Sequence, residues 1–279
     1  MADDLAVAPR PASTVVLARD AARGGIEIFL VQRHASMGFM GGMHVFPGGK
    51  VGPEDDSERM RAQIANCHDH ARQCPWGEDV AAPESLARAV AAVRETFEEA
   101  GVLFAVRESL AGAGGRTAEL RARLLAGEPF DALLEQAGLQ VDLGALQPLS
   151  RWITPASERQ RFDTMFYVAR APDGQDAEHD RSESIAGAWF APEQAAAAAR
   201  EGRIRLAPPT ALTLESLAAV ASVDAALALA ASRPPPTILP ILRTVESDVV
   251  ILYPGDPEHP VAEPAFAGPT RRILRRRAE

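Results

Sequence analysis

Three glutamates lie close together in one short stretch of the chain: Glu95, Glu98 and Glu99. On an α-helix, residues spaced i, i+3 and i+4 share one patch of the surface. Three carboxylates crowded in this way repel one another unless a positive charge lies among them. Their hard oxygen atoms suit Mg²⁺ or Mn²⁺ better than Zn²⁺. The stretch predicts either a divalent-metal site or a solvated acidic helix face, which is the commoner fate of a glutamate cluster.

A helix that begins near residue 82 must carry these carboxylates. The segment Ala82–Ser85 places a proline in the first turn, and Gly101 is a natural residue to end the helix. Apolar residues recur at the helical period and form a stripe on the side opposite the glutamates: Leu86, Val90, Val93 and Phe97. One side of the helix is thus predicted to pack in the core while the other presents the carboxylates.

The order of residues from Arg94 to Val102 is more specific than the glutamate cluster alone. It reads Arg-Glu-Thr-Phe-Glu-Glu-Ala-Gly-Val. This order resembles the second half of the Nudix box, Gly-x5-Glu-x7-Arg-Glu-U-x-Glu-Glu-x-Gly-U, where U is a bulky apolar residue. Thr96 at the first U position is a mild departure. Nudix hydrolases cleave nucleoside diphosphates linked to another group, so the resemblance implies a metal-dependent diphosphohydrolase that uses Mg²⁺ or Mn²⁺.

The resemblance also implies roles for individual residues. The expected metal ligands are Glu95, Glu98, Glu99 and the carbonyl of Gly49. One glutamate must act as general base toward the attacking water, and Glu98, Glu95 and Glu183 stay open as alternatives. Arg94 is expected to orient a box glutamate through an ion pair rather than to touch the substrate.

The first half of the box is interrupted. The segment Phe46-Pro47-Gly48-Gly49 is how a Nudix box usually begins, and its glycines can offer backbone groups to phosphates or a metal. Forty-four residues separate Gly49 from Arg94, whereas the family pattern has thirteen. The excess is placed at residues 52–83. It leaves the first box glutamate without a clear counterpart, since forward spacing gives Asp55 and backward spacing gives Leu86.

A long insertion at this point resembles the Nudix branch that includes the peroxisomal coenzyme A diphosphatases. Part of their upstream signature is present, because Arg33 and Gly42 match, but His34 and Gly38 replace a small residue and an arginine. An arginine at position 38 would hold a phosphate by a two-pronged contact. The resemblance implies coenzyme A or acyl-coenzyme A as substrate. Alternatives are hydrolysis of ADP-ribose, a dinucleotide or a nucleotide sugar, and a non-catalytic nucleotide-sensing Nudix domain.

Further polar residues are predicted to lie near this site. Arg161 and Asp163 begin an expected strand with aromatic neighbours, which suits a substrate that carries phosphate and a base. A structural Arg–Asp pair at the mouth of the strand is the alternative. Glu183 precedes Trp189 in a context that resembles the loop from which Nudix enzymes bring one more glutamate to the metal. The predicted substrate-binding residues are Arg33, Phe46, Gly48, Arg161 and Asp163.

The pattern of apolar residues alone supports an α/β or α+β fold. The resemblance implies the Nudix α/β/α sandwich, a mixed sheet between helices, with helical insertions. Strands are expected at 13–19, 26–33, 102–106, 149–154, 161–170 and 249–253. Helices are expected within 108–137, with a break near 127–129, and at 192–201 and 208–231. One Nudix domain is predicted at 10–262, with insertions at 52–83 and 107–147, followed by a basic tail at 263–279.

Composition limits the classes of partner. With 279 residues, 47% of them apolar, the chain can bury a full core. Its formal charge of −9 argues against nucleic-acid binding, which needs a basic surface. No apolar run approaches the roughly 18 residues of a membrane span. The expected partner is a small-molecule nucleoside diphosphate, with neither nucleic acid nor membrane, and the oligomeric state stays open with a homodimer as one option.

The two cysteines, Cys67 and Cys74, do not make a disulfide framework, so a reducing cytoplasm is expected. Together with His68 and His70 they resemble a set of zinc ligands. The spacing Cys-His-x-His-x3-Cys fits no common structural zinc pattern, however, and an ordinary helical excursion is the favoured interpretation.

Overall fold

The computed structural model describes residues 7–66, 80–106, 116–180, 183–246 and 248–274. The cysteine and histidine cluster considered as a zinc site, from Cys67 to Cys74, lies outside these residues. Among the helices of the described segments, none has the length and apolar character needed to cross a membrane.

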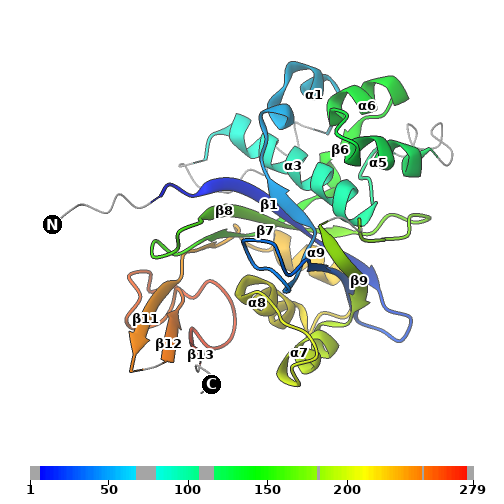
Figure 1. Cartoon of the computed structure of the whole chain (residues 1–279). Coiled ribbons are helices and arrows are strands. Elements are labelled where there is room, and N and C mark those ends of the chain that lie inside the picture. Colours follow the sequence, from blue (N-terminus) through cyan, green and yellow to red (C-terminus); the bar gives the residue numbers. More distant parts are fainter. Residues whose placement is uncertain (1–6, 67–79, 107–115, 181–182, 247, 275–279) are drawn as a thin grey trace.

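A mixed sheet forms the centre of the molecule (Figure 1). Its main path runs β10-β7-β8-β1-β2-β3, with β4 paired to β1 and β9 paired to β2. The strands are β1 (Arg10–Asp20), β2 (Ile26–Arg33), β3 (His44–Val45), β4 (Gly48–Lys50), β7 (Gln147–Ile153), β8 (Phe162–Arg170), β9 (Ser184–Phe190) and β10 (Thr237–Ile238). β1 is parallel to β8 and antiparallel to β2 and β4. The four strands predicted between residues 13 and 33 and between 149 and 170 are confirmed, with slightly different ends.

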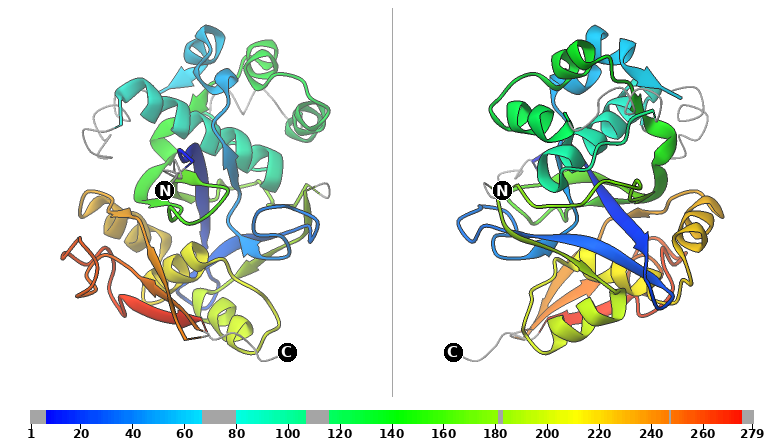
Figure 2. Two further views of the ribbon diagram at one scale, coloured as in Figure 1. Left: turned by 60° about the vertical axis from the view of Figure 1, so that its left-hand side comes forward. Right: turned by 90° about the vertical axis from the view of Figure 1, so that its right-hand side faces the viewer.

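Helices cover both faces of this sheet. On one face lies α3 (Ala82–Ala100), with α1 (Glu58–Ala62), α5 (Thr117–Leu125) and α6 (Phe130–Ala137) beyond it. On the other face lie α7 (Pro192–Arg200), α8 (Pro208–Leu217) and α9 (Val223–Ala231), and Figure 2 shows the same layers from two further directions. Side chains of β1 alternate between the two cores, with Val15 and Leu17 toward α3 and Val16 and Ala18 toward α8 and α9. The arrangement confirms the predicted α/β/α sandwich.

Helix α3 begins and ends as the sequence predicts. A proline lies in its first turn, and Gly101 ends it in the left-handed conformation with φ of 71°. Val90, Val93 and Phe97 are buried in the core cluster beneath it. Its opposite side is therefore the one that carries the glutamates.

Short elements join the two predicted insertions. Turn η1 (Pro53–Asp56) follows β4, and β5 (Ile64–Ala65) pairs in parallel with β6 (Val141–Asp142), which precedes the turn η2 (Leu143–Ala145). Helices α5 and α6 confirm the helical prediction within 108–137 and its break near Gly127. The insertion after β4 and the helical insertion thus lie side by side above α3 (Figure 1).

Two predicted elements are wrong. Residues 102–106 form no strand, since Ala105 alone makes an isolated bridge to Val141. The side-chain amide of Gln175 takes the place of a strand partner by bonding to both the N–H and the carbonyl of Leu103, at 2.9 and 3.0 Å. The helix predicted at 208–231 is divided into α8 and α9, because the Ser222 hydroxyl accepts a hydrogen bond from the third N–H after it and begins a new helix.

The C-terminal region is more ordered than the sequence suggests. Strands β11 (Ile241–Val245), β12 (Asp248–Leu252) and β13 (Arg271–Leu274) form a separate antiparallel sheet. The strand predicted at 249–253 corresponds to β12. The predicted basic tail at 263–279 is wrong at residues 271–274, because Arg271 pairs with Asp256 and Glu258 and holds β13 against β12.

Candidate active site

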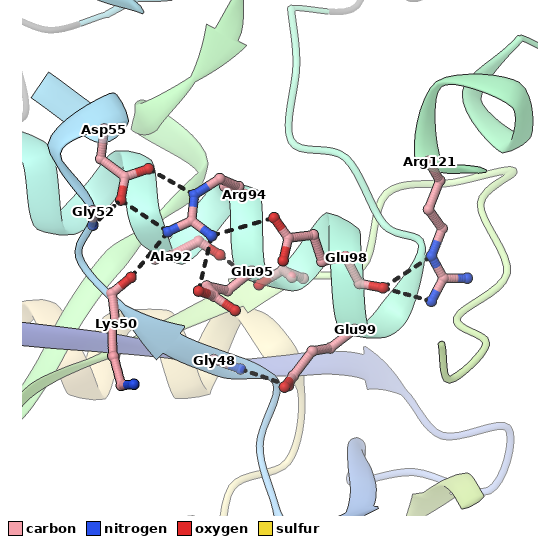
Figure 3. A network of polar contacts seen from close by, with 11 residues as sticks. Gly48, Lys50, Gly52, Asp55, Ala92, Arg94, Glu95, Glu98, Glu99 and Arg121 are labelled. Carbon is pink, nitrogen blue, oxygen red and sulfur yellow. Dashed lines mark hydrogen bonds and ion pairs between the residues drawn. The ribbon is translucent and has the colours of Figure 1, made fainter. Parts of the chain in front are cut away.

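The three glutamates of α3 are withdrawn from solvent. Glu99 is buried, Glu95 is largely buried, and Glu98 is the most accessible, with 27% of its side chain exposed. They face β4 and the turn η1 rather than open water (Figure 3). This placement argues against the solvated acidic face.

Arg94 organises the carboxylates around it (Figure 3). Its Nη1 lies 2.8 Å from Oε1 of Glu95 and 3.2 Å from Oε1 of Glu98, and its Nη2 donates to the carbonyl of Lys50 at 2.9 Å. Burial acts to lower the pKa of the Arg94 guanidinium, but its pairs with Asp55, Glu95 and Glu98 outweigh burial and raise it. Arg94 therefore stays charged and orients two of the glutamates.

Asp55 is the second partner of Arg94. Its two carboxylate oxygens accept from Nε and Nη2 of Arg94 at 2.8 and 2.9 Å, and it also accepts from the N–H of Gly52 at 2.8 Å. Forward spacing from Gly49 had pointed to this residue, and the turn η1 brings it there. The inserted residues follow Asp55 in the chain, so the first part of the box, up to Asp55, still contacts the second part at Arg94.

The two glycines of β4 allow the strand to approach α3. The N–H of Gly48 donates to Oε2 of Glu99 at 2.9 Å. A Cβ added at Gly49 would overlap the carboxyl group of Glu95, and one added at Gly48 would overlap the backbone of Thr14. Lack of space, rather than an unusual φ angle, therefore explains why glycine stands at both positions.

The electrostatics of the trio indicate uncompensated negative charge. Burial raises the pKa of Glu95 to about 7, with the charge of Glu98 adding to it and Arg94 opposing it. Burial also raises the pKa of Glu99 to about 8, with a further contribution from Glu95. The pKa of Glu98 is raised as well, again mainly by burial. One arginine does not balance these carboxylates.

The donor set fits a hard divalent cation. Three carboxylates and a backbone carbonyl are the oxygen ligands that Mg²⁺ and Mn²⁺ prefer. Within the part of the chain that the structure describes, no three acidic, histidine or cysteine side chains are already gathered as a metal site. Arg94 holds Glu95 and Glu98, and the N–H of Gly48 holds Glu99, so the carboxylates bond to the protein's own donors.

Arg33 and Glu183 approach the trio from the sheet. The N–H of His34 donates to the carbonyl of Glu183 at 2.8 Å and joins the end of β2 to the start of β9. Burial is the main cause of the raised pKa values of Glu98 and Glu99, and the charge of Glu183 adds a smaller contribution to both. The charge of Arg33 acts in the opposite direction and lowers the pKa of Glu99. The Nε of Arg33 is buried and has no hydrogen-bond partner within the described residues. The structure thus places Arg33 and Glu183, two of the residues predicted from outside the box, near the glutamates.

Comparison with known proteins decides the family. The model of the NUDT19 Nudix domain matches residues 9–217. The chain belongs to the Nudix hydrolase family. As a Nudix hydrolase it is an enzyme of the group that generally uses divalent metal ions.

Relatives of this Nudix hydrolase span most of its length. It is 30% identical to acyl-coenzyme A diphosphatase NUDT19 of Gallus gallus, over 87% of this chain and 75% of that protein. It is 28% identical to the protein of the same name from Homo sapiens, over 88% of this chain and 76% of that protein. Among solved structures, a Nudix hydrolase from Alicyclobacillus acidocaldarius has a TM-score of 0.63 and 29% identity, covering 79% of this chain and 96% of that chain.

Three residues predicted to bind substrate have other roles in this Nudix domain. Phe46 is buried in the core and packs edge-on to Phe166, with ring centroids 6.2 Å apart. Arg161 is buried and donates to the carbonyls of Thr154 and Val7 at 3.1 and 2.8 Å. Both side chains are thus engaged within the protein, and their binding of substrate stays a prediction.

Asp163 is the third of these residues, and it is enclosed by two arginines. Arg151 of β7 binds both of its carboxylate oxygens at 2.8 Å, and Arg88 of α3 binds Oδ2 at 2.9 Å. Arg88 is fully buried and also bonds to Glu84 at 2.6 Å. Asp163 therefore fastens α3 to the sheet, and its arginine partners are not the neighbouring Arg161. Sequence reasoning missed Arg88 and Arg151 because they come from distant segments.

A cavity of about 330 Å³ opens beside the trio. It is lined by Glu54, Arg94, Glu98, Leu124, Gly127, Glu128, Pro129 and Phe130. The helical insertion thus forms one wall of the space that Glu98 faces, and no pattern in the sequence predicts this wall.

Proposed function

We propose that this Nudix hydrolase cleaves the diphosphate bond of coenzyme A or acyl-coenzyme A with Mg²⁺ or Mn²⁺. The observation that carries the chemistry is the partly buried trio of Glu95, Glu98 and Glu99, in which a single arginine pairs with two of the carboxylates and excess negative charge remains. The substrate class is supported by the relatives named acyl-coenzyme A diphosphatase, which align along most of the chain.

The trio and the carbonyl of Gly49 would hold the cation. A divalent cation supplies charge that neutralises diphosphate oxygens and lowers the pKa of a bound water. Raised pKa values at Glu95 and Glu99 support this assignment, because they reveal carboxylates that are poorly stabilised in the absence of a cation. Arg94 and Asp55 do not touch the substrate in this scheme but fix the orientation of the ligands.

Glu98 is our candidate for the general base. Water attacks a phosphorus atom, the bridging P–O bond breaks, and the proton of the water passes to a carboxylate. Glu98 is the most accessible glutamate of the trio and lines the cavity, and its pKa is raised, mainly by burial, toward the working range of a base. Glu183 is the second candidate because its exposed carboxylate lies on the loop next to the trio.

Arg33 is our candidate for binding a substrate phosphate. Its Nε is buried without a partner within the described residues, and its charge acts on Glu99. A guanidinium placed in this way has unused donors for an anion.

One observation favours a different diphosphate. The upstream signature of coenzyme A-cleaving Nudix enzymes has a second arginine, and this chain has Gly38 at that position. The second candidate substrate is therefore ADP-ribose, a dinucleotide or a nucleotide sugar. The sensor alternative is disfavoured because the trio of Glu95, Glu98 and Glu99 is intact.

Product analysis with a panel of diphosphates tests the proposal. The protein is incubated with Mg²⁺ or Mn²⁺ and coenzyme A, an acyl-coenzyme A, ADP-ribose, NADH, a dinucleoside polyphosphate or a nucleotide sugar. We expect 3′,5′-ADP and phosphopantetheine, or its acyl form, from the first two substrates. Cleavage of another substrate alone would replace the coenzyme A assignment, and absence of any cleavage would favour a sensor.

We also infer a cytoplasmic location for the chain from its two cysteines. Fractionation of the cells that produce the protein tests this inference, and recovery in another compartment would contradict it.

A further inference from the structure

Arg121 connects three segments at the active site. It lies on α5, in the helical insertion, and its guanidinium reaches across to the backbone carbonyl of Glu98 (Figure 3) and to that of Glu178. Its Nε and Nη2 lie 3.1 and 2.8 Å from the carbonyl oxygen of Glu98, and Nη2 lies 2.7 Å from that of Glu178. An inserted helix therefore bonds directly to the backbone of a trio residue.

These contacts complete the end of α3. The last carbonyls of a helix lack partners within it and carry partial negative charge. Arg121 satisfies the carbonyl of Glu98, and the N–H of Glu178 satisfies that of Ala100 at 2.9 Å. A Cβ at Gly101 would come within 2.8 Å of Arg121 Nη1, so the residue that ends α3 leaves room for the guanidinium. The guanidinium of Arg121 thus fixes the last turn of α3, which carries Glu98 and Glu99.

The same guanidinium holds the segment that leads to Glu183. Its bond to the carbonyl of Glu178 fixes the start of that segment. Two residues later, the carboxylate of Asp180 accepts from the N–H groups of Glu183 and Ser184 at 2.9 and 3.0 Å. Arg121 is thus bonded to Glu178, and Asp180, two residues farther along the chain, bonds to the backbone of Glu183 and Ser184.

We propose that Arg121 is a positioning residue that sets the last turn of α3 and the Glu183 loop in register for metal binding and hydrolysis. The proposal rests on the proposed function for its catalytic part. Through its position on α5, it makes the helical insertion a working part of the active site.

Mn²⁺ binding in the absence of substrate is the first test. Groups that orient metal ligands typically contribute about 10–100-fold to metal affinity or activity. We expect Arg121→Ala to weaken Mn²⁺ binding by about tenfold, measured by electron paramagnetic resonance of free Mn²⁺. Arg121→Lys should recover part of the affinity, since an ammonium reaches one carbonyl but lacks the planar fork that serves two.

A matched control separates this role from general stability. Arg233 also donates to a backbone carbonyl, that of Ala265 at 2.6 Å, but in the C-terminal region. Arg233→Ala should leave Mn²⁺ affinity unchanged. Mn²⁺ binding by Arg121→Ala equal to that of the wild type would overturn the proposal, and if Arg121→Ala does not fold, Arg121→Lys decides in the same assay.

Kinetics then test the connection to Glu183. We expect Arg121→Lys to lower kcat while KM for the diphosphate stays unchanged. If Arg121 acts partly through the loop, the double variant with Glu183→Gln should lose less activity than the product of the two single losses. Fully multiplicative losses would overturn the connection to Glu183. A wild-type protein that cleaves no diphosphate would count against the proposed function, whereas the Mn²⁺ assay would still decide the role of Arg121.

Discussion

Asp55 and Arg94 form a two-pronged ion pair although they lie 39 positions apart in the chain. The pair joins Nε to Oδ1 at 2.8 Å and Nη2 to Oδ2 at 2.9 Å, with both side chains more than nine-tenths buried. It closes the Nudix box around the insertion that interrupts it. The same guanidinium binds Glu95 and Glu98, so the pair fixes the orientation of the metal-ligand candidates.

Asp55→Asn is expected to destabilise the protein strongly. Arg94 keeps Glu95 and Glu98 as partners, but Asn can accept only one of the two guanidinium bonds, and a buried charged donor that loses its partner costs about 1–3 kcal/mol or more. Urea unfolding measures this loss. Asp56→Asn is the matched control, because the pair of Asp56 with Arg61 is exposed and contributes at most about 1 kcal/mol. Equal losses for the two variants would contradict the role assigned to Asp55.

Gly49→Ala is expected to disturb the site, whereas Gly38→Ala is expected to be neutral. A methyl group at Gly49 would overlap the Glu95 carboxyl, while one at Gly38 would meet nothing within 4 Å. Overpacking of this kind costs about 1–3 kcal/mol and would displace Glu95. Thermal unfolding and Mn²⁺ titration of both variants test the prediction, which fails if Gly49→Ala binds Mn²⁺ as tightly as Gly38→Ala.

Metal binding is expected to strengthen as pH rises. With pKa values of about 7 for Glu95 and about 8 for Glu99, these carboxyls hold protons near neutral pH, and a cation must displace them. Mn²⁺ affinity should therefore increase between about pH 6 and pH 8, by up to about tenfold per unit for each proton released. Calorimetric titrations in buffers of different ionisation enthalpy measure both the affinity and the protons released. An affinity independent of pH would contradict the prediction.

Stability of the metal-free protein should change in the opposite direction. The folded pKa values of Glu95 and Glu99 lie above the ordinary value of 4.5, so the folded state binds more protons than the unfolded chain between about pH 4.5 and pH 8. Stability that these groups contribute is lost as pH rises through that window. Mn²⁺ offsets the loss, so the increase of Tm on adding Mn²⁺ should be larger at about pH 8 than at about pH 6. Thermal scans with Mn²⁺ or EDTA test this.

Asp163→Asn is expected to reduce stability rather than substrate affinity. It would leave Arg88 and Arg151 without their shared carboxylate in a buried position, at a cost of about 3–5 kcal/mol. Asp224→Asn serves as the control, since the Asp224 side chain is 85% exposed. Chemical unfolding measures the stability of each variant, and KM reports its affinity for the substrate. A raised KM with unchanged stability would restore the original assignment of Asp163 to substrate.

Local patterns in the sequence predict the parts of this molecule that local interactions build. Helix α3, its glycine end and its glutamate face follow from residue spacing within one stretch, and β1 and β2 follow from short apolar runs. The order of residues in the box also identifies the family. These features need no knowledge of which distant segments meet.

The remaining features depend on contacts between distant segments. Arg88 and Arg151 enclose Asp163 from two elements, and Gln175 replaces the strand partner of Leu103. Spacing offered two positions for the first box glutamate, Asp55 and Leu86, and the folded turn η1 places Asp55 against Arg94. Sequence patterns predict which residues share one face of a helix or strand. They do not predict these side-chain pairs, which form only when distant segments of the chain pack together.

Hydrolysis of coenzyme A by the wild type and by Glu98→Gln, side by side with Mg²⁺, tests the central claim most directly. The substitution keeps the size of the side chain but removes a charge that would bind the cation and accept a proton. We predict that the wild type releases 3′,5′-ADP and that Glu98→Gln releases it at least about 100-fold more slowly while keeping the wild-type fold by circular dichroism. Wild-type turnover by Glu98→Gln would contradict the assignment of the glutamate trio as the catalytic centre.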